Sequence, residues 1–341
     1  MKKITSKRFI IPIIICCALI LGVAYFYLFS SISKGGKTQY LYVDNDDDID
    51  SVYTKLDSIT TSSGMAAFSM LARHSGYGDK IIPGRYALEP NMGAMRFLRN
   101  LKKGAETPLH LTIPSVRTMD KLASVLGKKL LVDSLELQKA FSDSATCARY
   151  GLDTLTIGCL FIPNTYDVYW TIPTKELLDR MQKESRVFWN SDRQRKADAL
   201  GMTKVQIITL ASIIDEETSN DAEKPMIAQM YLNRLKKDMP LQADPTVKFA
   251  LKQFELRRIY HEHLTVSSPF NTYRNKGLPP GPIRIPSVAG IDAVLNHASH
   301  DYLYMCAKED FSGTHNFAKT YEEHLQNAKR YADALNKRGI K

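Results

Sequence analysis

An uncharged stretch near the N-terminus constrains this chain more than any other feature. It runs from Phe9 to Phe29 without Asp, Glu, Lys or Arg, and four basic residues precede it. A hydrocarbon core about 30 Å thick is crossed by a helix of about 20 apolar residues. A cleaved signal peptide usually has a shorter apolar core and ends at small residues, whereas this stretch ends in Tyr and Phe, which are typical of a membrane interface. We therefore expect an uncleaved transmembrane helix at 9–29.

The flanking charges predict how this helix is oriented. The basic cluster lies on its N-terminal side, and only Lys34 and Lys37 follow closely on the other side. Because basic loops stay in the cytoplasm, residues 1–8 are predicted to be a cytoplasmic tail. The rest of the chain is then extracytoplasmic, with a periplasm as the expected compartment of this single-pass protein.

Composition limits the partners. The chain has 341 residues and a formal net charge of +10, enough for one anchor and roughly two domains. The positive charge favours acidic partners, such as an anionic membrane surface or a carboxylate-bearing wall polymer. No nucleic-acid motif is present, so no nucleic-acid partner is expected. Cys147 and Cys159 either form a disulfide or remain buried thiols, and the sequence leaves both alternatives open.

The pattern along the chain predicts an α+β fold. Residues 30–39, "SSISKGGKTQ", are interpreted as a short Ser/Gly linker. A strand–turn–helix theme then recurs three times between residues 40 and 126, and from about residue 134 the chain is mainly helical with few strands. Residues 264–290 are rich in Pro and Gly and predict a loop.

No metal or cofactor is expected. The acidic run "DNDDDID" at 44–50 cannot be an EF-hand loop, because Ile49 and Lys55 occupy the positions that require Gly and Glu. Solvated aspartates, one of them capping a helix, are the simpler interpretation. The histidines near 261–263 and 297–300 fit no common ligand spacing, and there is no phosphate-binding loop.

The segment "ITLASIIDEET" carries an apolar helix into three consecutive acids. On a helical wheel with 100° per residue, one broad apolar face is formed by Ile207, Leu210, Ala211 and Ile214. Glu217 shares this face, Asp215 lies on its flank, and Glu216 points nearly opposite, towards water. Glu217 is therefore the acid expected to face inward.

An inward carboxyl group has useful chemistry. Contact with apolar side chains disfavours its charged form, so its pKa rises and it can hold a proton near neutral pH, as a general acid must. The alternative is an ordinary acid at a helix end, either solvated or neutralised by a nearby cation such as Lys224.

Four long motifs carry a resemblance to a known family. They are "LASIIDEET", "YLNRLKKDMPLQADPTVKFAL", "FNTYRNKGLPPGPI" and "GTHNFAKTYEEH". In this order they resemble motifs of the YceG-like endolytic murein transglycosylases, and "PGRYAL" resembles a turn of that family's LysM-like subdomain. The resemblance implies a LysM-like α+β subdomain at 40–108 and a mainly helical catalytic domain at 109–341.

The resemblance also implies an activity. Family members are lyases anchored in the cytoplasmic membrane that cut nascent glycan strands internally, between N-acetylmuramic acid and N-acetylglucosamine. They leave a 1,6-anhydro end and terminate glycan elongation. The expected partners are peptidoglycan glycan strands, the cytoplasmic membrane and, as candidates, peptidoglycan synthases. A muramidase-type hydrolase that uses Glu217 with Asp244 or Asp215, and a non-catalytic wall-binding module, remain as alternatives.

The family's motifs point to individual residues. Its catalytic acid falls on Glu217, although Asp215 and Glu216 stand where the family has a Glu and a basic residue. The extra negative charge is expected to raise the pKa of Glu217 further. Asp244 is also a candidate helix cap. The residues expected to line the substrate cleft are Gln242, Asp244, Asn271, Thr272, Tyr273 and His315.

Overall fold

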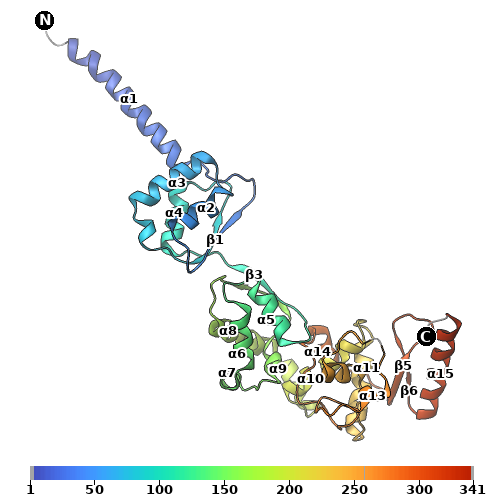
Figure 1. The fold of residues 1–341 in the computed structure, drawn as a ribbon. Coiled ribbons are helices and arrows are strands. Elements are labelled where there is room, and N and C mark those ends of the chain that lie inside the picture. Colours follow the sequence, from blue (N-terminus) through green and yellow to red (C-terminus); the bar gives the residue numbers. More distant parts are fainter. Residues whose placement is uncertain (1–3, 257, 339–341) are drawn as a thin grey trace. The chain divides into compact units, whose positions relative to one another are not determined.

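The structure is a computed structural model that describes residues 4–256 and 258–338 (Figure 1). Its residues form two compact units. The first comprises the chain up to Leu111 with 129–131 and 167–172, and the second comprises 112–128, 132–166 and the chain from Pro173 onward. Both contain helices and small two-stranded sheets, so the fold is mixed and mostly helical.

The first unit packs helices against an antiparallel pair of strands. Strands β1 and β2 pair in a register that sets Leu41 opposite Tyr86, and both of these side chains are buried in the core. The elements of this unit are α1 (Ile4–Phe29), β1 (Gln39–Val43), α2 (Ile49–Asp57), α3 (Ser62–His74), η1 (Tyr77–Asp79), β2 (Gly84–Leu88) and α4 (Ala94–Lys103).

Helix α1 contains the stretch predicted to cross a membrane. Its apolar part among the residues with described side chains is Ile11–Gly22. Among the residues with described side chains, no single helix is both long and apolar enough to span a bilayer. Helices α9 (Ser191–Ala199) and α10 (Lys204–Glu217) pass the same test only as a pair bent by 83°. The predicted cytoplasmic tail 1–8 lies partly outside the described residues.

Residues 30–39 do not form a free linker. Ile32 is 1% exposed and belongs to the core of the first unit. Its N–H donates to the carbonyl of Met92, and its own carbonyl accepts the N–H of Thr61. A Cβ at Gly64 would lie only 2.6 Å from the Ile32 Cβ. One apolar residue within a polar, glycine-containing segment thus anchors it, because its burial removes apolar surface from water.

The acidic run at 44–50 forms intramolecular contacts. Asp48 is the N-cap of α2 and accepts the N–H of Ser51, which confirms the predicted cap. Asp44 and Asp47, expected to be solvated, both bind the ammonium group of Lys55. The lysine that excluded an EF-hand loop is therefore the counter-charge of these two carboxylates.

The second unit is built around helix α10. It contains the strand pairs β3–β4 and β5–β6, although the unit boundary passes through β3 and β4. Its elements are β3 (Leu109–Ile113), α5 (Met119–Gly127), α6 (Ser134–Ser142), α7 (Ser144–Arg149), η2 (Ile157–Leu160), β4 (Asn164–Val168), α8 (Thr174–Phe188), α9 (Ser191–Ala199), α10 (Lys204–Glu217), α11 (Lys224–Lys236), α12 (Asp244–Leu251), α13 (His261–Leu264), α14 (Val288–Leu295), β5 (Tyr304–Ala307), β6 (His315–Ala318) and α15 (Tyr321–Lys337).

The three consecutive acids, Asp215, Glu216 and Glu217, are the last residues of helix α10. It begins with a capping box between Thr203 and Gln206, and every residue from Ile207 to Ile214 is buried. This all-round burial identifies it as a central core helix. Cys147 and Cys159 are also buried in this unit, and both are free thiols, so of the two alternatives the disulfide is not formed.

Candidate active site

The first acid at the end of α10, Asp215, is a buried partner of a lysine. Its Oδ1 lies 2.7 Å from Nζ of Lys224, and the two side chains are 4% and 6% exposed. The N–H and hydroxyl of Ser287 also donate to this carboxylate. Lys224 thus neutralises an acid of the cluster, as the sequence alternative allowed, but the acid is Asp215 and not Glu217.

The second acid, Glu216, does not face water as its place on the helical wheel predicted. Arg117 donates to it from Nε and Nη2 at 2.8 and 2.9 Å, and Arg284 donates from Nη1 at 3.1 Å. The side chain is only 11% exposed. The prediction was wrong because a wheel shows only the helix's own residues, whereas both arginines come from distant segments that cover this face.

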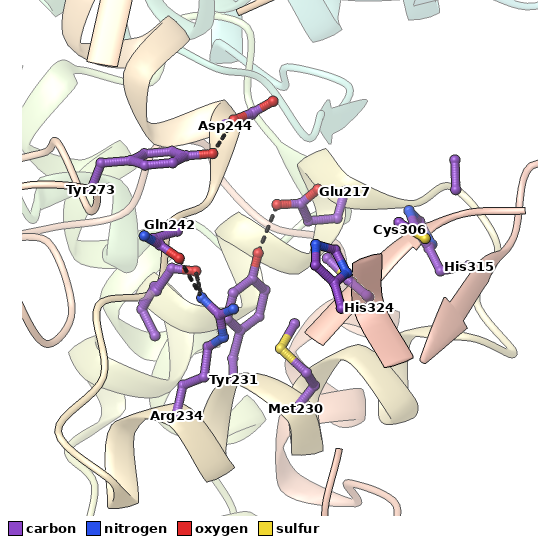
Figure 2. A pocket seen from close by; sticks show the side chains of 13 residues that line it. Glu217, Met230, Tyr231, Arg234, Gln242, Asp244, Tyr273, Cys306, His315 and His324 are labelled. Carbon is purple, nitrogen blue, oxygen red and sulfur yellow. Dashed lines mark hydrogen bonds between the residues drawn. The ribbon is translucent and has the colours of Figure 1, made fainter. Parts of the chain in front are cut away.

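The third acid, Glu217, lies against a cavity, and no cation among the described residues is in hydrogen-bond contact with it. Tyr231 donates its hydroxyl proton to Glu217 Oε1 at 2.7 Å (Figure 2). Burial raises the pKa of Glu217 to about 7; the Tyr231 hydrogen bond opposes this rise, while the charges of Asp244 and Glu216 add to it. Desolvation is therefore the main cause, as expected for a carboxyl group on an apolar helix face.

The cavity has a volume of about 370 Å³ and a mixed polar and apolar wall. Helices α10 and α11 form one side with the segment 241–244 and Tyr273, and β5, β6 and α15 form the other (Figure 2). Its lining residues are Glu217, Met230, Tyr231, Arg234, Leu241, Gln242, Asp244, Tyr273, Met305, Cys306, Ala307, His315 and His324.

Asp244 and Tyr273 form a pair on the cavity wall. The Tyr273 hydroxyl donates to Asp244 Oδ1, and burial, with this carboxylate second, raises the pKa of Tyr273. Asp244 is the first residue of α12, but the N-cap position belongs to Ala243 and no side chain caps the helix. The alternative that Asp244 is a helix cap is therefore wrong, and its carboxylate is available to the cavity.

Gln242 enters the cavity from a strained backbone. Its φ is +52°, in the left-handed region that residues other than Gly, Asn and Asp rarely adopt. Its N–H donates to the carbonyl of Thr272 at 3.1 Å, and its Oε1 accepts from Arg234 at 3.3 Å. Arg234 also donates to the carbonyls of Pro240 and Leu241, so this one guanidinium holds the turn that presents Gln242.

Asn271 and Thr272 do not line the cavity, in contrast to the prediction. They are 0% and 1% exposed. The Asn271 side chain donates to the carbonyls of Leu264 and Val266, and the Thr272 hydroxyl accepts the N–H of Ala243. These polar groups satisfy buried backbone atoms and fix the loop that carries Tyr273.

His315 lies at the cavity with a buried carboxylate behind it. Glu223 Oε2 is 3.0 Å from His315 Nδ1, and Glu223 Oε1 accepts the backbone N–H of the same residue at 2.6 Å. A carboxylate in this position orients an imidazole ring and favours its proton on Nδ1. The expected cleft residues Gln242, Asp244, Tyr273 and His315 thus meet around Glu217.

Among the lining residues that sequence reasoning did not single out are Tyr231, Arg234 and His324. Tyr231 and Arg234 are three residues apart on α11, so they share one helix face, and this spacing within "YLNRL" was the available signal. Nδ1 of His324 is buried without a hydrogen-bond partner among the described residues. Burial, with Arg234 next, lowers the pKa of His324, which favours the neutral form of this ring.

The site can perform proton transfer on a polar ligand. It joins one carboxyl group that titrates near neutrality to a ring of hydrogen-bonding side chains, a combination typical of a general acid in a binding cleft. Across the described ranges, no group of three His, Cys, Asp or Glu side chains could hold a metal ion.

The comparisons with known proteins agree with one another. The model of the YceG-like family matches residues 41–330. The chain belongs to the YceG-like family. It is 28% identical over 344 residues to the endolytic murein transglycosylase of Bacillus subtilis, covering 94% of this chain and 93% of that protein. It is 25% identical over 370 residues to the endolytic murein transglycosylase of Streptococcus pneumoniae, covering 96% of this chain and 66% of that protein.

A solved structure resembles this YceG-like chain. The crystal structure of a YceG-like protein from Listeria monocytogenes superposes with a TM-score of 0.55 at 26% sequence identity. The match covers 86% of this chain and 99% of that one.

Proposed function

We propose that this YceG-like chain is an endolytic murein transglycosylase, a lyase that cuts peptidoglycan glycan strands internally. The observation that carries the proposal is Glu217: its carboxyl group borders a polar cavity, and its pKa of about 7 lets it both donate and accept a proton near neutral pH. The names of the Bacillus subtilis and Streptococcus pneumoniae relatives support the same activity.

Glu217 would act in two steps. Its protonated carboxyl first donates to the oxygen of the β-1,4 bond between N-acetylmuramic acid and N-acetylglucosamine, and that C–O bond breaks. The C6 hydroxyl of the muramic acid then attacks its own C1 and gives its proton to the Glu217 carboxylate. The product is a 1,6-anhydro end, no water is consumed, and the acid is regenerated. Because the attack is intramolecular, proximity replaces the second carboxylate that hydrolysing glycosidases use.

Four further residues would contact the glycan. Gln242, Asp244, Tyr273 and His315 present hydrogen-bonding groups around Glu217, as sugar hydroxyl and amide groups require. Asn271 and Thr272 would not contact the glycan. Their side chains bind backbone groups and hold the loop that carries Tyr273.

A muramidase is the second candidate. Asp244 is a carboxylate close enough to raise the pKa of Glu217, and two carboxylates can hydrolyse a glycosidic bond. Asp215, the other candidate partner, is held by Lys224 and Ser287 and does not line the cavity. Hydrolysis would leave a reducing end in place of an anhydro end.

The products decide between these functions. The full-length chain in detergent is incubated with uncrosslinked glycan strands, and the fragments are analysed by mass spectrometry. Internal cuts with 1,6-anhydro ends are expected. Reducing ends would show that the protein is a muramidase. Uncut strands would support the alternative of a non-catalytic wall-binding module.

The proposed setting is the outer face of the cytoplasmic membrane. Helix α1 would be the single-pass anchor over 9–29, with residues 1–8 in the cytoplasm, a LysM-like subdomain at 40–108 and the catalytic domain at 109–341. The uncharged sequence of the stretch and the exposed apolar side chains of Ile11–Gly22 support the anchor. Nascent glycan strands and their synthases would then be within reach, and cutting would terminate glycan elongation. Protease added to intact spheroplasts should digest all but the anchor.

A further inference from the structure

Tyr231 makes the only described hydrogen bond to the carboxyl group of Glu217. It comes from the middle of α11 and is 1% exposed, so its ring is packed in the core of the second unit. Its hydroxyl group points towards the carboxyl group of Glu217 (Figure 2). The bond joins the hydroxyl to Oε1 at 2.7 Å and leaves Oε2 of Glu217 without a partner among the described residues.

We propose that Tyr231 is a positioning residue that keeps the transferable proton of Glu217 on Oε2, the carboxyl oxygen that it does not bind. The inference rests on the proposed function for its catalytic consequence, but its physical basis is the geometry of this one hydrogen bond.

The direction of the bond follows from the surroundings of the phenol. If the protonated Glu217 donated to the phenol oxygen, the phenol proton would need another acceptor. In the described part of the chain, this hydroxyl has no other hydrogen-bond partner, and a buried donor without an acceptor is costly. The phenol therefore donates in both protonation states of Glu217. Burial and the neighbouring Glu217 raise the pKa of Tyr231, so the phenol keeps its proton.

Other groups around Glu217 change its charge balance without fixing one oxygen. Asp244 and Glu216 favour the protonated form, whereas Lys248 favours the carboxylate. The remaining titratable or charged side chains at the cavity are Arg234, Tyr273, Cys306, His315 and His324. Since none of these residues donates to Glu217 in the described structure, Tyr231 is the group that distinguishes the two oxygens.

The same oxygen then serves both steps of the reaction. Oε2 releases its proton to the glycosidic oxygen and later receives the proton of the C6 hydroxyl. Between the two transfers, the carboxylate is stabilised through the Tyr231 bond to Oε1. No rotation of the carboxyl group is required, which preserves the aligned geometry that makes proton transfer efficient.

The decisive variant is Tyr231→Phe, which removes the hydroxyl and keeps the ring. We expect kcat to fall about tenfold with little change in KM. The high-pH limb of the kcat profile should also move up by about one pH unit, because the variant loses a bond that favours the charged form. Tyr166→Phe is the matched control, since that buried hydroxyl donates to the carbonyl of Ile162, away from the cavity. The control should leave the limb in place.

A measurement without catalysis separates this inference from the proposed function. In protein labelled with ¹³C at the glutamate carboxyl carbons, the Glu217 signal is assigned with Glu217→Gln and followed through a pH titration. Its pKa should be about one unit higher in Tyr231→Phe than in the wild type. Equal titrations would overturn the role of Tyr231, whereas a shift in a protein that makes no anhydro ends would refute only the activity.

A second perturbation covers the case in which Tyr231→Phe does not fold. Incorporation of 3-fluorotyrosine at Tyr231 keeps the shape of the ring and makes the phenol a stronger donor. The Glu217 titration should then move to lower pH, opposite to the shift in Tyr231→Phe. A shift to higher pH, or none, would contradict the proposed direction of the bond.

Discussion

The surroundings of Glu216 and Glu217 differ sharply, although the two residues are adjacent in the chain. Glu216 receives three hydrogen bonds from Arg117 and Arg284. From the residues that the structure describes, Glu217 receives one, from the neutral phenol of Tyr231. Both carboxyl groups are largely withdrawn from water, so burial alone does not distinguish them. The charge of the partner does: Glu216 binds two guanidinium groups, whereas Glu217 binds a neutral phenol and can remain protonated.

This comparison separates a carboxylate that stabilises the fold from one that can react. Environments that differ in this way for two nearby acids are a general sign of acid–base chemistry. Four substitutions test this contrast between the acids at the end of α10. They follow in order of the expected effect on rate, stability or pH dependence.

The largest effect is expected for Glu217→Gln. The amide keeps the shape of the side chain but has no proton to donate, so the rate of anhydro-product formation should fall by about 10³-fold. The free energy of unfolding should not decrease, because a buried ionisable group is replaced by a neutral one. Product formation within tenfold of the wild type would refute the catalytic assignment.

Asp215→Asn should have the next largest effect, this time on stability. The substitution leaves the buried ammonium group of Lys224 without its buried counter-charge, and the free energy of unfolding should fall by about 3 kcal/mol. Chemical denaturation followed by circular dichroism measures the loss. Asp221→Asn is a matched control: Asp221 also lies 2.7 Å from Lys224 but is 69% exposed, so the loss should stay under about 1 kcal/mol.

Glu216→Gln is the direct counterpart of the Glu217 change. It weakens the bonds with Arg117 and Arg284, and the free energy of unfolding should fall by about 2 kcal/mol. The rate should remain within about threefold of the wild type, since Glu216 does not line the cavity. If the rate fell as far as in Glu217→Gln, the division of roles between the two acids would be wrong.

The smallest effect expected is a displacement along the pH axis. The reaction requires protonated Glu217, whose pKa is raised to about 7. The rate should therefore be highest below this pH and fall about tenfold for each unit above it. Asp244→Asn removes a negative charge that raises this pKa, so the fall should begin at lower pH. A profile that already declines near pH 4.5, the ordinary pKa of Glu, would show that the acid is solvated.

The sequence predicted the part of the site that depends on local periodicity. The position of Glu217 on the apolar face of α10 follows from helix geometry, and its raised pKa follows from that position. The surroundings of Glu216 could not be predicted, because Arg117 is 99 residues away in the chain. No helical wheel contains such a partner.

The type of a polar residue also does not indicate whether its side chain lines a cavity or is buried in the fold. Asn271, Thr272 and Tyr273 form one tripeptide with hydrogen-bonding side chains, but only Tyr273 lines the cavity. The other two complete the hydrogen bonds of buried backbone groups. Similarly, the Ser- and Gly-rich composition of residues 30–39 suggested a linker. The burial of Ile32 could not be predicted, because a single isoleucine in a polar segment gives no periodic pattern.

Thr272 links two segments that are distant in the chain. Its carbonyl and hydroxyl accept the backbone N–H groups of Gln242 and Ala243, and its hydroxyl also contacts that of Thr246. Substitutions in these two segments are therefore expected to depend on one another. Among relatives, a change of side-chain size at 272 should be tolerated only with a compensating change at 246, so paired substitutions are expected where single ones are selected against.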